Sequence, residues 1–198
     1  MISRRSLLLL PAFLSLAGCA AMTVPAGFAP DKVKLPVLRP DFREPLTLTA
    51  DQLITLTFAE AAVAKGAPAS VPELRAMLVI KGDSLDMALI ALNVSVWRIH
   101  ASPDGIQESR HRLLDGRLQA EPMLRDLVFC LWPEASLRAQ LDADPNGPWS
   151  LSVSENRRVL AKGTTRMIEM TQTGSVMTLV NHPEGYSLRI ETRVESEP

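Results

Sequence analysis

Residues 186–194 read YSLRIETRV, and apolar and polar side chains alternate along this stretch. Tyr186, Leu188 and Ile190 fall on one face of an extended chain, whereas Arg189 falls on the other. A period of two is that of a β-strand, because successive side chains point to opposite faces of a sheet. The stretch therefore predicts a strand that is buried on one face and solvated on the other.

The same alternation occurs elsewhere in the chain. Three further stretches show it: ELRAMLVIKG at 73–82, TRMIEMTQ at 165–172 and VMTLVN at 176–181. Five turn-forming tetrapeptides interrupt the apolar runs: KGDS at 81–84, SPDG at 102–105, SENR at 154–157, QTGS at 172–175 and HPEG at 182–185. Short connections of this kind join antiparallel neighbours. The sequence thus predicts a mainly β domain whose sheet is an antiparallel meander.

One segment has a different period. The stretch EPMLRDLVFCLWPEASLRAQLDAD at 121–144 places its apolar residues at helical spacing, and Pro133 should end or kink the first helix. We expect a two-part helical insert near 121–142 to lie across the apolar face of the sheet as a lid, because nothing else in the chain can cover that face.

Sheet and lid would enclose either a solid core or a ligand cavity, and the sequence leaves both open. In the second case a hydrophobic ligand would contact apolar side chains of both layers. The candidate cavity residues are Leu78, Ile80, Trp97, Leu124, Leu127, Val128, Leu131, Tyr186 and Leu188.

The N-terminus has the features of an export signal. Arg4 and Arg5 precede a leucine run that is too short to span a bilayer, and small residues lead to Cys19. The stretch Leu16–Cys19 resembles the lipobox of bacterial lipoproteins, which implies that residues 1–18 are a signal peptide and that Cys19 is acylated. The two arginines fit a twin-arginine signal as well as an ordinary secretory one.

Several features follow from that anchor. In the lipoproteins that this stretch resembles, an Asp after the cysteine retains the protein in the inner membrane, and here Ala20 follows. The resemblance therefore implies an outer-membrane anchor, a domain that faces the periplasm, and partners in the export and sorting machinery. Residues 19–45 are rich in proline and predict an extended tether, and residues 46–198 predict one domain. A net charge of −1 without a basic run argues against nucleic acid.

Two motifs suggest chemistry that the rest of the sequence does not support. Gly82–Leu85 spells the GDSL block of an esterase family, with Ser84 as nucleophile, but no histidine stands three residues after an aspartate as the family's base does. DADPNG at 142–147 begins like a calcium loop, yet Val153 occupies the position of its bidentate glutamate. We expect a hairpin turn and a polar turn, and no catalytic residue, metal or cofactor.

The order of these features resembles a family of proteobacterial lipoproteins of unknown function, often encoded beside aryl-polyene biosynthesis genes. The motifs concerned are Trp132-Pro133 and a closing Asn-x-x-x-Gly-Tyr-x-Leu-x-Ile that begins at Asn181. A more distant similarity to the lipoprotein-localisation factors LolA and LolB implies a curved antiparallel half-barrel that is closed by helices. It also implies a non-catalytic protein that binds or transfers an acyl or polyene lipid. The alternatives are a structural or assembly lipoprotein with a solid core and, less well supported, the Ser84 esterase.

Overall fold

The computed structural model describes residues 33–43, 46–64, 66–67, 73–91, 93–112 and 119–194. The predicted signal peptide and Cys19 lie outside these residues. Ten strands and three helices form the described part of the chain. The strands are β1 (Leu48–Phe58), β2 (Leu74–Lys81), β3 (Ser84–Ala91), β4 (Val94–Ser102), β5 (Gly105–Arg110), β6 (Ser150–Ser154), β7 (Arg157–Lys162), β8 (Thr165–Thr173), β9 (Val176–Asn181) and β10 (Tyr186–Val194). The helices are α1 (Glu60–Ala64), α2 (Ala120–Leu131) and α3 (Glu134–Ala143).

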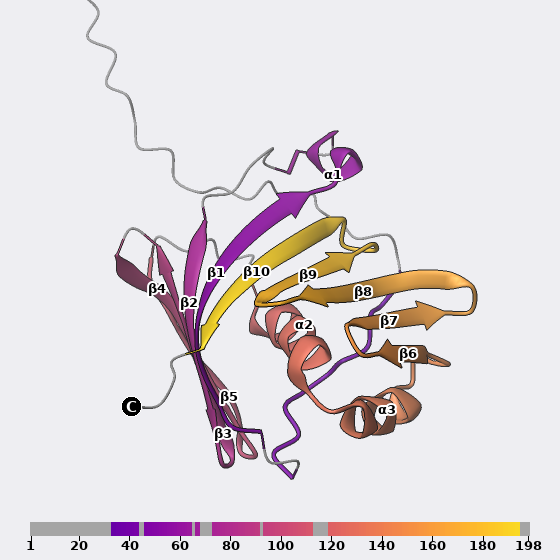
Figure 1. Ribbon diagram of the computed structural model, residues 1–198, viewed down its shortest axis with the longest axis horizontal. Coiled ribbons are helices and arrows are strands. Elements are labelled where there is room, and N and C mark those ends of the chain that lie inside the picture. The colour runs from indigo at the N-terminus through magenta and orange to yellow at the C-terminus, as the bar shows by residue number, and fades with distance from the viewer. Residues whose placement is uncertain are drawn as a thin grey trace, which may run out of the picture.

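All ten strands belong to one antiparallel sheet in the order β5-β4-β3-β2-β1-β10-β9-β8-β7-β6. Hairpins connect β2 to β5 and β6 to β10, so the predicted meander is confirmed within each half. The first and last strands join the halves, with Phe58 opposite Tyr186. The sheet is open and curves around α2 (Figure 1).

The predicted strand faces are confirmed. In β2, Leu78 and Ile80 are buried while Met77 is half exposed. In β10, Ile190 is buried and Arg189 is exposed. The alternation decides these faces because a pleated strand can bury only every second side chain on a one-sided core.

The two-part helical insert is also present. α2 ends at Leu131, and Pro133 is the residue that precedes the first turn of α3. Proline lacks a backbone N–H and fixes its own φ, so it cannot continue α2 but fits at the start of α3. Both helices lie within the curve of the sheet (Figure 1).

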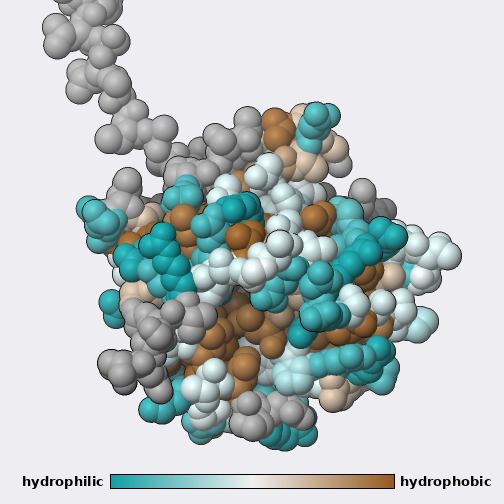
Figure 2. Space-filling view, viewed as in Figure 1, coloured by the Kyte–Doolittle hydropathy of each residue, from teal (hydrophilic) through white to brown (hydrophobic). Residues whose placement is uncertain are grey.

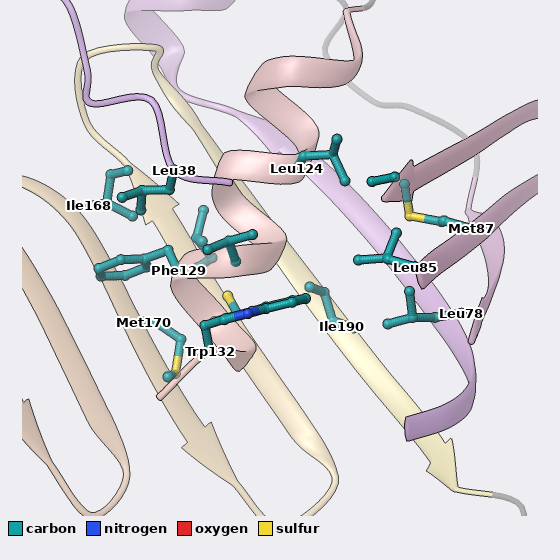
Figure 3. Packing of buried hydrophobic residues seen from close by; sticks show 14 of the residues in the cluster. Leu38, Leu78, Leu85, Met87, Leu124, Phe129, Trp132, Ile168, Met170 and Ile190 are labelled. Atoms are coloured by element: carbon teal, nitrogen blue, oxygen red, sulfur yellow. The ribbon is translucent and has the colours of Figure 1, made fainter. Parts of the chain in front are cut away.

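α2 is a core element rather than an amphipathic surface helix. Its buried residues are Ala120, Leu124, Arg125, Asp126, Val128, Phe129 and Cys130. At 100° per residue these positions surround most of the helix axis. Figure 3 shows why: on one side of α2 lie Leu85 and Met87 of β3, and on the other side lie Ile168 and Met170 of β8.

An extended segment, residues 33–42, packs against the helices, and we call it the strap. Leu38 of the strap is 1% exposed and belongs to the hydrophobic core. From the sequence, we expected these residues to form part of an extended, proline-rich tether at 19–45, outside the domain. The structure corrects that assignment, because Leu38 buries its side chain beside Phe129 and Ile168 (Figure 3).

Candidate functional site

The nine predicted cavity residues gather around one hydrophobic core. Five of them are at most 1% exposed: Leu78, Ile80, Trp97, Leu124 and Val128. The other four are partly buried and pack against that core: Leu127, Leu131, Tyr186 and Leu188. The structure therefore brings together residues from three strands, β2, β4 and β10, and from one helix, α2. Whether they contact a ligand stays a prediction.

One apolar row of α2 is only partly covered. Met123, Leu127 and Leu131 stand at i, i+4 and i+8, and each is partly exposed, while residues 124–126 and 128–130 between them are buried. Residues four apart lie above one another on a helix, so these side chains form a continuous apolar ridge. Figure 2 shows apolar side chains gathered in the middle of this face of the molecule, where Figure 1 places α2.

Trp97 is held in the wall of the sheet. Its indole Nε1–H donates a hydrogen bond of 3.1 Å to Glu108 Oε2, and the Arg110 guanidinium lies 4.6 Å from its ring centroid. Both partners come from β5, at the edge of the sheet. These contacts fix the ring, so Trp97 offers a rigid apolar surface rather than a movable gate.

None of the nine residues lines either of two surface depressions of about 230 Å³ each. The first follows α3 and is lined by Asp144, Gly147 and Trp149, among others. The second lies beside Asp51 and Arg75, which form a bidentate ion pair at 2.6 and 2.7 Å.

Beneath α2 lies a polar cluster that the sequence analysis did not predict, formed by Arg125, Asp126, Asn181, Glu184 and Tyr186. Arg125 donates two hydrogen bonds to Glu184, of 2.8 and 2.7 Å, and one of 2.9 Å to Asp126. The Tyr186 hydroxyl donates to the other Asp126 oxygen. Asn181 donates to Glu184 at 2.9 Å and to the Tyr186 hydroxyl at 3.2 Å. The cluster therefore joins α2 to the β9–β10 turn.

The geometry of that turn depends on a glycine. Gly185 has φ of +67°, a conformation that residues with a Cβ rarely adopt, and its N–H donates to the Asn181 carbonyl at 2.9 Å. Asn181 accepts a hydrogen bond of 3.0 Å from the Glu184 backbone N–H. The turn thus presents Glu184 and Tyr186 to α2, which explains the spacing of the closing motif.

The ionisable groups of the cluster shift one another's pKa values. Burial raises the pKa of Asp126, against the opposing effects of Arg125 and of the hydrogen bond from Tyr186. Burial disfavours the charged form of Arg125, but its bonds to Glu184 and the charge of Asp126 outweigh this and raise its pKa. Burial also raises the pKa of Tyr186 well above 10.0. Arg125 therefore remains cationic, and the hydroxyl of Tyr186 remains a donor.

The sequence did contain a signal for this cluster. Arg125 and Asp126 interrupt an otherwise apolar run in α2, and charged residues are almost never buried unless they are paired. What the sequence did not show was their partners, which are about sixty residues away.

Ser84 lies in the predicted hairpin, and Cys130 lies in the core. Ser84 begins β3, and its hydroxyl donates to the Lys81 carbonyl at 3.2 Å across the predicted hairpin turn. Cys130 is buried and free, and burial raises the pKa of its thiol. Within the described ranges, no three metal-ligating side chains come together, and no helix is long and apolar enough to cross a membrane.

Comparison with known proteins identifies the family. Residues 49–194 match the family described as protein of unknown function, DUF3261. The chain belongs to this family. The match begins in β1 and ends with β10, so the DUF3261 region includes the whole sheet and both α2 and α3.

Other comparisons say less about this DUF3261 protein. A similar solved structure is the crystal structure of an outer membrane lipoprotein-sorting protein domain from Vibrio parahaemolyticus, at 9% identity and a TM-score of 0.35. The alignment covers 81% of this chain and 88% of that chain. These values describe a distant likeness in chain path only. None of the curated proteins matches the sequence.

Proposed function

We propose that this DUF3261 protein is an outer-membrane lipoprotein whose domain binds one hydrophobic chain of an acyl or polyene lipid without chemical conversion. The observation that carries the proposal is the apolar ridge of Met123, Leu127 and Leu131. These three apolar side chains are partly exposed, whereas residues 124–126 and 128–130 between them are buried.

The ridge has dimensions that suit a lipid chain. Eight residues of helix separate Met123 from Leu131, which corresponds to about 12 Å. A chain laid along the ridge would remove apolar surface from water on both partners, and this stabilises the complex by roughly 25 cal/mol for each Å². Leucine and methionine side chains can also adjust to ligands of different shape.

The membrane anchor of the proposal is Cys19. Two or more acyl chains on this residue would hold the protein on the membrane almost permanently. The absence of an Asp after Cys19, together with the family resemblance drawn from the sequence, supports the outer membrane, a periplasmic domain and contact with the lipoprotein sorting machinery. Within this proposal, a polyene lipid is the more specific candidate for the ligand.

A second candidate is a structural or assembly lipoprotein. The specific observation in its favour is the core around Leu124, Val128 and Phe129, each of which is at most 1% exposed. Close-packed interiors of this kind have no vacant space for a ligand unless side chains move.

Native mass spectrometry separates the two candidates. The chain from residue 20 onward, expressed in a bacterial periplasm, should retain a mass increment that corresponds to a lipid and that disappears after extraction with organic solvent. A fluorescent fatty acid should then bind to the delipidated protein in the micromolar range. Absence of both signals from the folded protein would leave the structural candidate.

A further inference from the structure

The strap is attached to α3 by a regular series of hydrogen bonds. The participating positions around α3 are four residues apart: Trp132, Ser136, Gln140 and Asp144. Their bonds run as follows: Asp144 Oδ2 accepts from the Val37 N–H (3.2 Å), Gln140 Oε1 accepts from the Arg39 N–H (2.8 Å), Gln140 Nε2 donates to the Arg39 carbonyl (3.0 Å), Trp132 Nε1 donates to the Asp41 carbonyl (3.1 Å) and the Ser136 hydroxyl donates to Asp41 Oδ2 (3.3 Å). We call these four residues the ladder.

The spacing of the ladder matches the spacing of the strap. Four residues of α-helix rise by about 6.0 Å, and two residues of an extended proline-rich chain advance by about 6.2 Å. Asp144, Gln140 and Ser136 therefore meet Val37, Arg39 and Asp41 in turn, and the two segments run in opposite directions. Four of the five bonds are to backbone groups, so the ladder recognises mainly an extended conformation, and Ser136 adds one bond to the Asp41 carboxylate.

The prolines of the strap occupy positions at which the ladder needs no backbone N–H. Pro36 and Pro40 lack an N–H, and both stand at even positions, whereas only Val37 and Arg39 donate backbone hydrogen bonds to the ladder. Proline also favours the extended conformation of the residue before it. The strap is therefore preorganised for the ladder, which lowers the entropy cost of binding.

Leu38 supplies the apolar part of the same contact. It is buried beside Phe129 and Ile168 (Figure 3). Val37, the preceding strap residue, is 53% exposed. Pro36 is also buried, and the side chains of Val33, Leu35 and Phe42 pack against the core. No strand of the sheet pairs with the strap. A segment that is held by buried side chains and side-chain hydrogen bonds, without strand pairing, resembles a bound peptide more than an integral strand.

We propose that the ladder and the adjoining apolar groove form a binding site for an extended, proline-spaced peptide, and that residues 33–42 are its resident ligand in cis. The site goes beyond the lipid ridge and shares no residue with it. Its occupant is the segment through which the chain continues toward Cys19.

Binding of the strap to the ladder limits the distance between the membrane anchor and the domain. This inference rests on the proposed acylation of Cys19. From Cys19 to Val33 there are fourteen residues by sequence, which at ~3.1 Å per residue allow at most about 43 Å. Release of the strap would add the residues up to β1 and so roughly double that reach. The strap is thus a releasable clamp on the membrane link.

A peptide exchange experiment on the full chain tests the site. A fluorescent peptide of sequence VKLPVLRPDF, residues 33–42, is added to the chain extracted from membranes, and binding is followed by anisotropy. The native chain should bind it at least about tenfold more weakly than the Leu38→Asp chain, because the resident strap competes at a high effective concentration. A peptide that carries the same Leu38→Asp change should not bind.

Three variants keep the result interpretable. Arg39→Pro removes one ladder N–H without altering the core and should also open the site, so a misfolded Leu38→Asp chain would not end the test. Val37→Thr retains the N–H and an exposed side chain, and should behave as the native chain. Adding Gln140→Ala to Leu38→Asp should weaken peptide binding severalfold.

The proposal is overturned if folded Leu38→Asp and Arg39→Pro chains, checked by circular dichroism, fail to bind the peptide. It is also overturned if the native chain binds the peptide equally well, or if Gln140→Ala has no effect. None of these outcomes depends on lipid binding, so the lipid proposal can fail independently.

Discussion

The hydroxyl of Tyr186, in the first position of β10, donates a hydrogen bond to the carboxylate of Asp126 in α2, across 60 residues of sequence. This bond connects the two motifs of the chain, because Asp126 stands on the helix that ends at Trp132-Pro133 and Tyr186 ends the Asn-x-x-x-Gly-Tyr turn. The polar cluster around it fixes α2 at one point on the sheet.

Removal of that hydroxyl should destabilise the domain. In Tyr186→Phe the ring remains, but Asp126 Oδ2 loses its donor and Asn181 loses an acceptor. Leaving buried polar groups without partners costs about 1–3 kcal/mol. Urea unfolding should show a lower midpoint with an unchanged m-value. An unaltered midpoint would mean that water replaces the hydroxyl and that the cluster is not a clamp.

The raised pKa of Asp126 predicts a particular pH dependence. Above the usual value of 3.8, the unfolded state loses this proton first, while the folded state retains it up to its own higher pKa. The folded state therefore binds more protons in that window, and stability falls as the pH rises through it. Asp126→Asn carries no titrating proton, so the native chain should lose melting temperature relative to this variant as the pH is raised above about 4. A constant difference between the two across that range would contradict the raised pKa.

Two leucines of α2 distinguish the core from the ridge. Leu124→Ala should cost about 2–5 kcal/mol, because Leu124 is 1% exposed and its loss leaves a cavity. Leu127→Ala should cost less, because Leu127 is partly exposed, but it should weaken binding of a fluorescent fatty acid several-fold. Thermal unfolding and probe titration of both variants measure the two effects. Equal losses of stability, with no probe bound by the native domain, would support the structural candidate.

The anchor can be tested by one substitution. Cys19→Ser should abolish incorporation of radiolabelled palmitate and release the protein from the outer-membrane fraction, because the thiol is the acceptor that the lipobox offers. Cys130→Ser serves as the matched control, since Cys130 is buried within the folded domain and should not affect labelling. Continued labelling of the Cys19→Ser protein would show that the lipobox interpretation is wrong.

Ser84 should be dispensable for any activity of the protein. Its hydroxyl bonds the Lys81 carbonyl in a surface hairpin, and loss of one exposed bond changes stability by about 0.5 kcal/mol or less. An assay with short-chain nitrophenyl esters should give the same low rate for Ser84→Ala and for the native chain. A rate that disappears only in the variant would restore the esterase hypothesis.

By itself the sequence determined the strands β2, β8, β9 and β10, the buried faces of β2 and β10, and the helices α2 and α3. The alternation in β2 and β10 places Leu78 and Ile190 in the core, and Pro133 separates α2 from α3, because both effects depend on residues that are close in the chain. The tertiary structure alone decided which distant groups meet. Arg125 and Asp126 have no local partner that would reveal Glu184 or Tyr186, since burial of a charge requires a partner but does not specify where in the sequence it lies. The strap is a further case: its prolines indicated an extended segment, but only the match between its spacing and that of α3, and the space left beside Phe129, decided that Leu38 would be buried there.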